Sequence, residues 1–593
     1  MLRKNPMTIK EIIEQFDTDS RRGFDEHDIS SSLRKLVPED KSQINETLKA
    51  ELMAFDFAED YQDKKTGWGT YFGPMMVWNN GDGTATESPS IKLITPEMID
   101  YWERRATESV NPIIIARYSG LVWDFKKKIT GINPSHEICR RYTKALIDQA
   151  NGDFHKYEVN TFRKLARALK LAISLNDDDL IKKCKDSLIN FENRHSQDTK
   201  PGLWGYAFDH LVGNKRINLS EQEENQIINE LEEKLSRLTK NDTESQKIDP
   251  WAAEAAAERL AIYYRKGQNN EDVNRVILEV GKAFDKIIGD ASAMQASGWL
   301  DHLHKLYLKF NLKEEAAKLL LRIRELGPKV ASELKPISHS FDLQKKEMDE
   351  YISAMTNGDI QEVLQRIAIR YIPIKEQVKE QIFDLSKKAP LTFLIGHQLQ
   401  DEKGRVIATI GSLEDDLEGH IVRQVSQNLS FSSIFLRAIF QESINQNGLN
   451  KEQILKFIEN SPIINTDRFE IINRGLEAYF VDDFLVTIHL LVPQIEEAIR
   501  NIVEFAGGNV LKPSRGGGYH LRTFDEILRD DIIKEALGED FADYFRILFT
   551  DQRGWNIRNN VCHGMASPNM FNPQTSDRVI HALLCLGLIH EKK

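Results

Sequence analysis

Four consecutive segments decide the fold class, and each carries apolar side chains three or four positions apart. They read AAEAAAERLAIYY (252–264), VNRVILEVGKAF (273–284), WLDHLHKLYLKF (299–310) and EEAAKLLLRIREL (314–326). This spacing places the apolar residues on one face of a helix. Helices are expected to start near residues 249, 270, 291 and 312, so that two of them form a unit of about 42 residues. The pattern predicts a helical-repeat scaffold that presents a surface and has no catalytic spacing.

Helical signals continue toward the N-terminus. Thr95 followed by Pro96 is typical of a helix start, because the Thr side chain caps backbone N–H groups and proline fits the first turn. Further helices are expected from Pro112 and from about Ser135 to Ala150. These segments together predict a helical domain at the N-terminal end.

A segment rich in glycine and aromatic residues, GWGTYFGPMMVWNNGDG (67–83), precedes these helices. No strand comes before it and no Lys-Ser or Lys-Thr pair follows it, so a phosphate-binding loop is disfavoured. We predict a structural loop in which Trp68, Tyr71 and Trp78 pack onto the helices.

One stretch interrupts the helical pattern. In FLIGHQLQDEKGRVIATIG (393–411), β-branched residues flank the turn-like sequence DEKG, which predicts a small β-hairpin. The expected fold is therefore all-α apart from this hairpin. The sequence suggests four parts, namely a helical N-terminal domain (1–150), a solenoid-like helical-repeat scaffold (151–390), a connector with the hairpin (391–478) and a C-terminal helical bundle (479–593).

Composition narrows the function classes. The 593 residues carry a formal net charge of −12, which argues against a protein that coats nucleic acid by charge alone. The cysteines at positions 139, 184, 562 and 585 form no CxxC pair, which indicates reduced thiols in the cytoplasm rather than disulfides or a zinc site. No signal peptide is expected, and the apolar run 579–589 is shorter than the roughly 20 residues of a membrane span. We expect this run to be a buried core helix and the protein to make no membrane contact.

The candidate chemistry lies near the C-terminus, in RNNVCHG (558–564). On a helix, Asn559 and His563 are four positions apart and share one face, with Arg558 on the adjacent flank. Gly564 is expected to end that helix. An Arg, an Asn and a His then stand together at a helix end.

The preceding segments give this motif its context. A long helix is expected over residues 481–508, bent at Pro493, and a Gly-rich loop, SRGGGYH (514–520), follows it. That loop repeats the Arg-to-His spacing of the motif at Arg515 and His520. A run of three glycines does not hold two side chains in a fixed geometry, so this second pair is not a candidate site.

These residue types suit RNA cleavage without a metal ion. A neutral His accepts the proton of the ribose 2′-OH near pH 7, and the fork of an Arg stabilises the charge that develops on the phosphate. An Asn can hold the His tautomer or a phosphate oxygen in place. The leaving 5′ oxygen needs a second proton, which a second copy of the motif from a partner chain would supply. The sequence has no P-loop, no HExxH and no carboxylate cluster with metal spacing, so neither a metal nor a cofactor is expected.

RNNVCHG resembles the RNxxxH active-site motif of the HEPN superfamily, helical domains that include many prokaryotic ribonucleases and toxins. The segment HLLVPQIEEAIR (489–500) resembles the first long helix of an HEPN-related domain of unknown function, found at the C-terminus of large bacterial proteins. YWERRATESVNPIIIARYSGLVWDF (101–125) resembles the N-terminal helical region of the same group. The middle of the chain is recognised only as helical.

The resemblance implies that Arg558 and His563 are catalytic, with Asn559 as the polar position between them. It implies an endonuclease that acts on tRNA or another structured RNA as a homodimer through the C-terminal domain, in antiviral defence or stress-induced growth arrest. Met565 stands where some relatives carry a tyrosine that a nucleotidyltransferase modifies, so that form of toxin control is not expected. Cys562 is disfavoured as a nucleophile, because it lies on a different helix face from His563 and has no activating partner.

Two further groups are expected near this site. Glu496 and Arg500, four positions apart on the long helix, are candidates for a supporting pair, with a solvated surface salt bridge as the alternative. From residue 485 to the end, 12 Lys and Arg face 14 Asp and Glu, so RNA binding requires a small focused patch. Its expected contributors are Arg515, Arg522, Arg553 and Arg558.

The sequence leaves two hypotheses open. In the first, the C-terminal domain is a ribonuclease that the N-terminal scaffold keeps inactive until a trigger arrives. In the second, the protein is not catalytic: its helical repeats bind a protein partner, and its C-terminal domain serves RNA binding or dimerisation. Burial of Arg558 and His563 inside a core would favour the second hypothesis.

Overall fold

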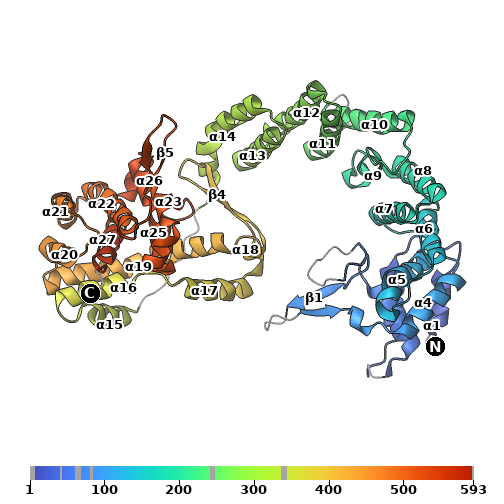
Figure 1. Cartoon of the computed structure of the whole chain (residues 1–593), viewed down its shortest axis with the longest axis horizontal. Helices are drawn as coiled ribbons and strands as arrows, with labels where there is room; N and C mark the ends of the chain where they lie inside the picture. The colour runs from blue at the N-terminus through green and yellow to red at the C-terminus, as the bar shows by residue number, and fades with distance from the viewer. Residues whose placement is uncertain are drawn as a thin grey trace. The chain divides into compact units, whose positions relative to one another are not determined.

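The computed structural model describes residues 7–40, 43–60, 68–79, 85–240, 248–335 and 344–590 (Figure 1). Helices dominate it, and the described strands form three short antiparallel hairpins, which confirms the predicted all-α class. The chain divides into two compact units, Met1–Arg322 and Ile323–Lys593. None of the described helices is both long and apolar enough to cross a membrane.

Unit one opens with helices that surround an aromatic core. They are α1 (Ile9–Phe16), α2 (Glu26–Arg34), α3 (Glu46–Asp56), α4 (Pro96–Glu108) and α5 (Pro112–Thr130), with hairpin β1 (Met76–Asn79) and β2 (Ala85–Ser88) and the 3-10 turn η2 (Ile91–Leu93) between α3 and α4. Thr95 caps α4 as predicted, because its side-chain oxygen accepts a hydrogen bond from the Met98 N–H at 3.3 Å. Trp102 and Tyr118 lie fully buried in this core.

The Gly- and aromatic-rich segment is not the loop that the sequence predicts. Its residues 67 and 80–83 lie outside the described part of the chain, but β1 lies within it and pairs with β2. Trp68 and Tyr71 pack against the helical core. Trp78 is 47% exposed, so the expectation that it packs onto the helices is wrong. Neighbouring side chains of a strand point to opposite faces, and the two-stranded hairpin leaves one face in solvent.

From α6 onward, helices follow one another along unit one, and each helix from α6 to α12 packs on the next. They are α6 (His136–Asn151), α7 (Glu158–Leu175), α8 (Asp178–His195), the 3-10 turn η3 (Pro201–Leu203), α9 (Tyr206–Leu211), α10 (Glu221–Thr239), α11 (Pro250–Lys266), α12 (Asn270–Ile288), α13 (Ala293–Lys309) and α14 (Lys313–Glu333), and the boundary between the two units falls within α14. Asp249, Asn269 and Ser292 cap α11, α12 and α13, so these three helices start within two residues of the predicted positions.

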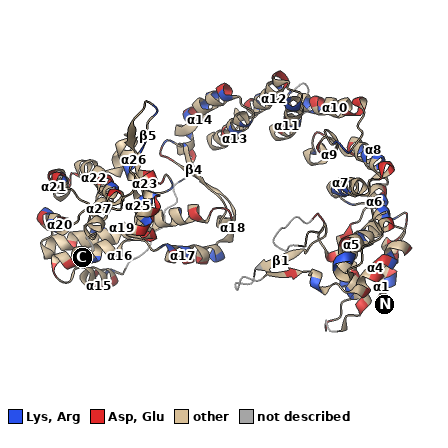
Figure 2. Ribbon diagram, viewed as in Figure 1, with Lys and Arg blue, Asp and Glu red and all other residues tan. Residues whose placement is uncertain are grey.

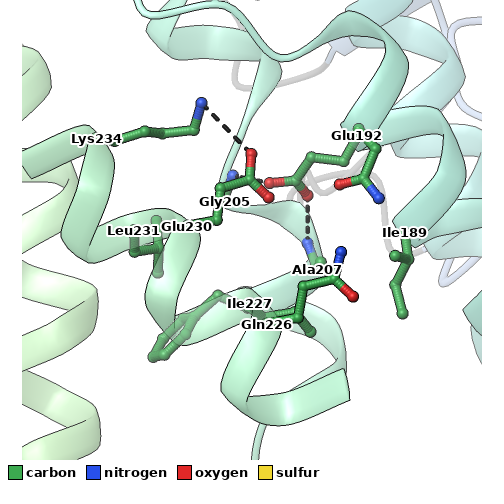
Figure 3. A pocket seen from close by; sticks show the side chains of 11 residues that line it. Ile189, Glu192, Gly205, Ala207, Gln226, Ile227, Glu230, Leu231 and Lys234 are labelled. Carbon is green, nitrogen blue, oxygen red and sulfur yellow. Dashed lines mark hydrogen bonds and ion pairs between the residues drawn. The ribbon is translucent and has the colours of Figure 1, made fainter. Parts of the chain in front are cut away.

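A buried carboxylate joins α8 to the start of α9 (Figure 3). Glu192 accepts hydrogen bonds from the backbone N–H groups of Gly205 at 2.5 Å and of Ala207 at 2.7 Å. Burial raises the pKa of the Glu192 carboxyl. Gly205 has φ +90°, and a Cβ there would lie 2.6 Å from the Arg259 side chain. The positive φ therefore favours glycine at this turn, and a side chain there would also displace the end of Arg259.

Unit two contains the predicted connector and the C-terminal helices. Its elements are α15 (Lys345–Thr356), α16 (Ile360–Arg370), α17 (Lys375–Lys388), α18 (Pro390–Leu394), β3 (His397–Gln400), β4 (Val406–Ile410), α19 (Leu417–Asn447), α20 (Lys451–Ile458), η4 (Thr466–Arg468), α21 (Phe469–Phe480), α22 (Phe484–Phe505), β5 (Leu511–Pro513), β6 (Tyr519–Leu521), α23 (Phe524–Leu528), α24 (Asp531–Leu537), α25 (Glu539–Phe549), α26 (Ile557–Cys562), η5 (Pro568–Met570) and α27 (Pro573–Gly587). The β3–β4 hairpin lies where the sequence predicts it. Buried residues from Met355 to Leu586 form one hydrophobic cluster, with members on both sides of sequence positions 390 and 478, which were expected to separate domains.

Helix α27 lies at the centre of this cluster and confirms the predicted core helix. It also buries polar groups. Asp577 accepts hydrogen bonds from the Tyr479 hydroxyl at 2.6 Å and from Arg437 at 3.2 Å. Arg578 donates to Ser433 Oγ at 3.1 Å, and the Tyr544 hydroxyl lies 2.7 Å from His581 Nδ1. Burial raises the pKa of Asp577 to about 6 and lowers the pKa of His581 to about 3.

The raised pKa makes Asp577 a source of pH-dependent stability. The folded chain binds this proton more tightly than the unfolded chain, so the free energy of unfolding falls as pH rises from about 4 through 6. Asparagine cannot titrate, so the free energy of unfolding of Asp577→Asn lacks this loss. When pH rises from about 5 to about 7.5, we expect the stability of the variant relative to the wild type to increase by about 1 kcal/mol. Urea unfolding at both pH values measures this difference. The exposed Asp482, 3.7 Å from the same Arg437, gives the control Asp482→Asn, which should show no such pH-dependent gain.

Candidate active site

Helix α26 is short and carries the RNNVCHG motif up to its C-terminal end. Ile557 and Val561 are buried beneath it, as the spacing predicts. His563 is the C-cap residue, and Gly564 has φ +68°, a conformation that favours glycine. The Gly564 N–H donates to the Val561 carbonyl at 3.2 Å. Gly564 therefore ends the helix as predicted and leaves His563 at its tip.

A carboxylate from α22 holds Arg558. The Arg558 Nε and Nη2 atoms donate to Glu496 Oε2 at 2.7 Å and Oε1 at 3.2 Å, which is a bidentate pair. Arg500 Nη2 also donates to Glu496 Oε1, so one carboxylate serves two guanidinium groups. The side chains of Arg558, Glu496 and Arg500 are 21%, 11% and 10% exposed. The supporting pair is thus formed in the interior rather than as a solvated bridge, and the three side chains together keep one positive charge.

Asn559 positions Arg558 and the loop before α26. Its Oδ1 accepts from Arg558 Nη1 at 3.2 Å. Its Nδ2 donates to the Thr550 carbonyl at 3.2 Å and to Asn556 Oδ1 at 2.8 Å, and Asn556 has φ +51°. The Asn559 amide is therefore engaged with its own loop. Within the described residues, no hydrogen bond joins it to the His563 ring, so the expectation that Asn559 fixes the His tautomer is not met inside one chain.

His563 is exposed, and its imidazole makes no hydrogen bond or ion pair with the residues that the structure describes. The ring is therefore open to solvent rather than sealed in a core. The neighbouring Cys562 is exposed as well, but partial burial of its thiol raises the pKa. A thiol with a raised pKa stays protonated near pH 7, which further disfavours Cys562 as a nucleophile.

The segment predicted as a Gly-rich loop is a hairpin, β5–β6, which extends from beside α26 in Figure 1. Arg500 Nη1 donates to the Arg522 carbonyl at 2.7 Å, and this bond ties the base of the hairpin to the Glu496–Arg558 pair. The Arg522 side chain donates to Asp530 at 2.6 Å and to the Asn509 carbonyl at 2.9 Å. Arg522 therefore fastens the hairpin to the bundle, and its charge is paired.

The other expected RNA-binding residues differ in what they contact. Arg553 donates to both carboxylate oxygens of Asp551, at 3.0 and 2.9 Å. Arg515 is exposed at the turn of the β5–β6 hairpin and makes no ion pair within the described residues. Tyr519, which the sequence analysis did not single out, is 75% exposed on β6. Arg515 and Tyr519 thus leave a cation and an aromatic ring exposed on this hairpin.

The structure brings Arg558, Asn559, Glu496 and Arg500 into one hydrogen-bonded group and leaves His563 exposed at the end of the same helix. In comparisons with known proteins, no family model, curated protein or solved structure matches this chain significantly. The residues and their geometry are therefore the basis of the functional proposal.

Proposed function

We propose that unit two carries a metal-independent RNA endonuclease site of the HEPN type, with Arg558, Asn559 and His563 as its central residues. The observation that supports it is the exposed His563 imidazole at the end of the short helix on which Arg558 is held in place. In this proposal, His563 takes the 2′-OH proton as a general base, or protonates the leaving 5′ oxygen as a general acid. Arg558 stabilises the phosphorane, and the product ends in a 2′,3′-cyclic phosphate.

The hydrogen bonds that hold Arg558 leave part of its guanidinium available to bind a phosphate. A guanidinium has five N–H groups. In Arg558, two of them donate to Glu496 and one donates to Asn559, so two N–H groups remain for phosphate oxygens. Because Glu496 is shared with Arg500, the group keeps one positive charge that favours an anion. Glu496, Arg500 and Asn559 act as positioning residues, because they hold the fork of Arg558 in one orientation.

The proposal includes a homodimer of unit two that acts on tRNA or another structured RNA. Cleavage requires proton removal at the 2′-OH and proton donation at the 5′ oxygen on opposite sides of the phosphorus. One His563 does not easily serve both positions, and a second His563 from a partner chain would complete the pair. Lys and Arg alternate with Asp and Glu along both units (Figure 2), so RNA binding depends on local contacts. A part in antiviral defence or stress-induced growth arrest rests on the resemblance to the HEPN superfamily and not on the residues of the site.

The direct test uses a synthetic RNA hairpin and the same sequence with 2′-O-methyl groups, both in EDTA. We expect the full-length protein to cleave only the unmodified RNA, because methylation removes the attacking hydroxyl. Mass spectrometry of the fragments should find 2′,3′-cyclic phosphate ends. Cleavage of both substrates, dependence on added metal, or no cleavage of any RNA, tRNA included, would contradict the proposal and leave the helical scaffold as the function.

The β5–β6 hairpin provides a separate prediction on binding. In a cleavage-defective His563→Ala background, we expect Arg515→Glu to weaken RNA binding by about tenfold or more and to lower the slope of log Kd against log salt by about one. Fluorescence anisotropy at several salt concentrations measures both. The control is Arg474→Glu, which reverses an exposed arginine on α21. If Arg515→Glu and its parent bind RNA with equal affinity, the hairpin is not part of the RNA-binding surface.

A further inference from the structure

Unit one contains a hollow of about 220 Å³ that the nuclease proposal does not use. It lies against α7 and α9, and Asp60 and Tyr71 also line it. Its lining consists of three basic side chains, two tyrosines, a histidine, an aspartate and an alanine. We infer that this hollow binds the phosphate group of a small phosphorylated metabolite.

The basic side chains form a line on one helix. Arg163, Arg167 and Lys170 occupy positions i, i+4 and i+7 of α7, so they share one face. Arg163 and Lys170 are exposed and make no ion pair within the described residues. These two cations outnumber Asp60, the carboxylate in the lining of the hollow, so an anion is attracted there.

Arg167 lies deeper and is already positioned. Its Nη2 donates to Asp124 Oδ1 at 2.9 Å, and the other oxygen of Asp124 accepts the backbone N–H groups of Tyr71 and Phe72 at 2.7 and 3.2 Å. The Arg167 guanidinium lies 4.6 Å from the centre of the Tyr71 ring. Its Nε is buried and has no hydrogen-bond partner within the described residues. Because this atom has almost no accessible surface, the phosphate contacts that we expect in the hollow come from Arg163 and Lys170.

A second, larger hollow lies next to the first, and most of its basic side chains are paired with carboxylates. It has a volume of about 480 Å³ and shares Asp60, Tyr71 and Arg163 with the smaller one. Its other basic groups are paired: Lys164 contacts Glu59 and Glu26, each at 2.8 Å, and Arg117 contacts Glu59 at 3.0 Å. Carboxylates thus neutralise the larger hollow. The unpaired positive charge is concentrated on the α7 side, where we place the phosphate.

Aromatic rings form the other walls of the smaller hollow. Tyr206 stacks on Phe162 with ring centres 4.1 Å apart and an angle of 4°, which fixes its orientation. His210 lies 6.4 Å from the Tyr206 ring. Burial and the charge of Lys170 lower the pKa of His210, so the imidazole is neutral near pH 7 and serves as a hydrogen-bonding group. The hollow therefore offers charge for a phosphate and flat surfaces for the group attached to it.

Isothermal titration calorimetry of the full-length protein with inorganic phosphate, AMP and adenosine tests the site. We expect phosphate and AMP to bind and adenosine not to bind. The double variant Arg163→Gln/Lys170→Gln should bind AMP at least tenfold more weakly. The matched control Lys144→Gln/Lys182→Gln changes two exposed lysines of α6 and α8 and should bind AMP as the wild type does.

The other outcomes overturn the inference. They are no binding of phosphate or AMP to the wild type, equal binding of adenosine and AMP, and unchanged AMP affinity in the Arg163→Gln/Lys170→Gln variant. If a 5′-phosphorylated RNA binds more tightly than AMP, and if the same variant loses this binding, the hollow binds RNA instead of a small metabolite. Circular dichroism melting of both double variants separates loss of the site from loss of the fold.

Discussion

Replacing His563 by alanine is expected to lower the rate of RNA cleavage by about 10²–10⁴-fold, the usual contribution of a general acid or base. The ring is exposed and makes no hydrogen bond or ion pair with a described residue, so it is free to exchange protons with a substrate. Arg558 and its partners do not contact the His563 ring through any hydrogen bond that the described residues make. The substitution should therefore remove proton transfer and leave the guanidinium in place.

The same substitution should leave the fold intact. Helix α26 ends through the backbone of Gly564 and not through the His563 side chain, so the free energy of unfolding should change by no more than about 0.5 kcal/mol. His590→Ala, at another exposed histidine of unit two, serves as the control and should cleave RNA at the wild-type rate. Equal rates for His563→Ala and the wild type would end the catalytic assignment.

Replacing Glu496 by alanine is expected to lower the free energy of unfolding by about 3–5 kcal/mol, as for a buried ion pair that loses one partner. Two guanidinium groups depend on this carboxylate, and both are mostly buried. Without it, Arg500 and Arg558 repel each other, and their N–H groups lose charged acceptors. RNA cleavage should fall too, because the fork of Arg558 is no longer held.

Urea unfolding of Glu496→Ala and of Glu497→Ala measures this effect. Glu497 is the next residue on α22 and lies 3.7 Å from the partly exposed Arg468, so its removal should cost less than about 1 kcal/mol. Glu496→Gln keeps one acceptor oxygen and should fall between the two. Similar stabilities for the two alanine variants would show that the Glu496 group contributes no more than a surface bridge.

Local signals predicted much of the secondary structure and the end of the motif. Thr95 and Asp249 cap the helices that start directly after them, and Gly564 ends the helix directly before it. These effects depend only on neighbouring residues, so the local sequence predicts them. The segment 67–83 by itself does not predict a strand, because its strand β1 pairs with β2, which lies beyond the segment. The sequence pattern therefore predicted elements where the cause is local and failed where a partner strand is needed.

In the candidate site, too, local sequence predicts some features and only the tertiary structure decides others. The sequence by itself determined that the chain is helical and that Arg558, Asn559 and His563 stand at one helix end, because spacing on a helix fixes which side chains are neighbours. Only the tertiary structure decided that Glu496, 62 positions away, holds Arg558 and leaves His563 free. It likewise placed Tyr71 against Arg167. Such pairs depend on how distant helices pack, and no local pattern carries that information.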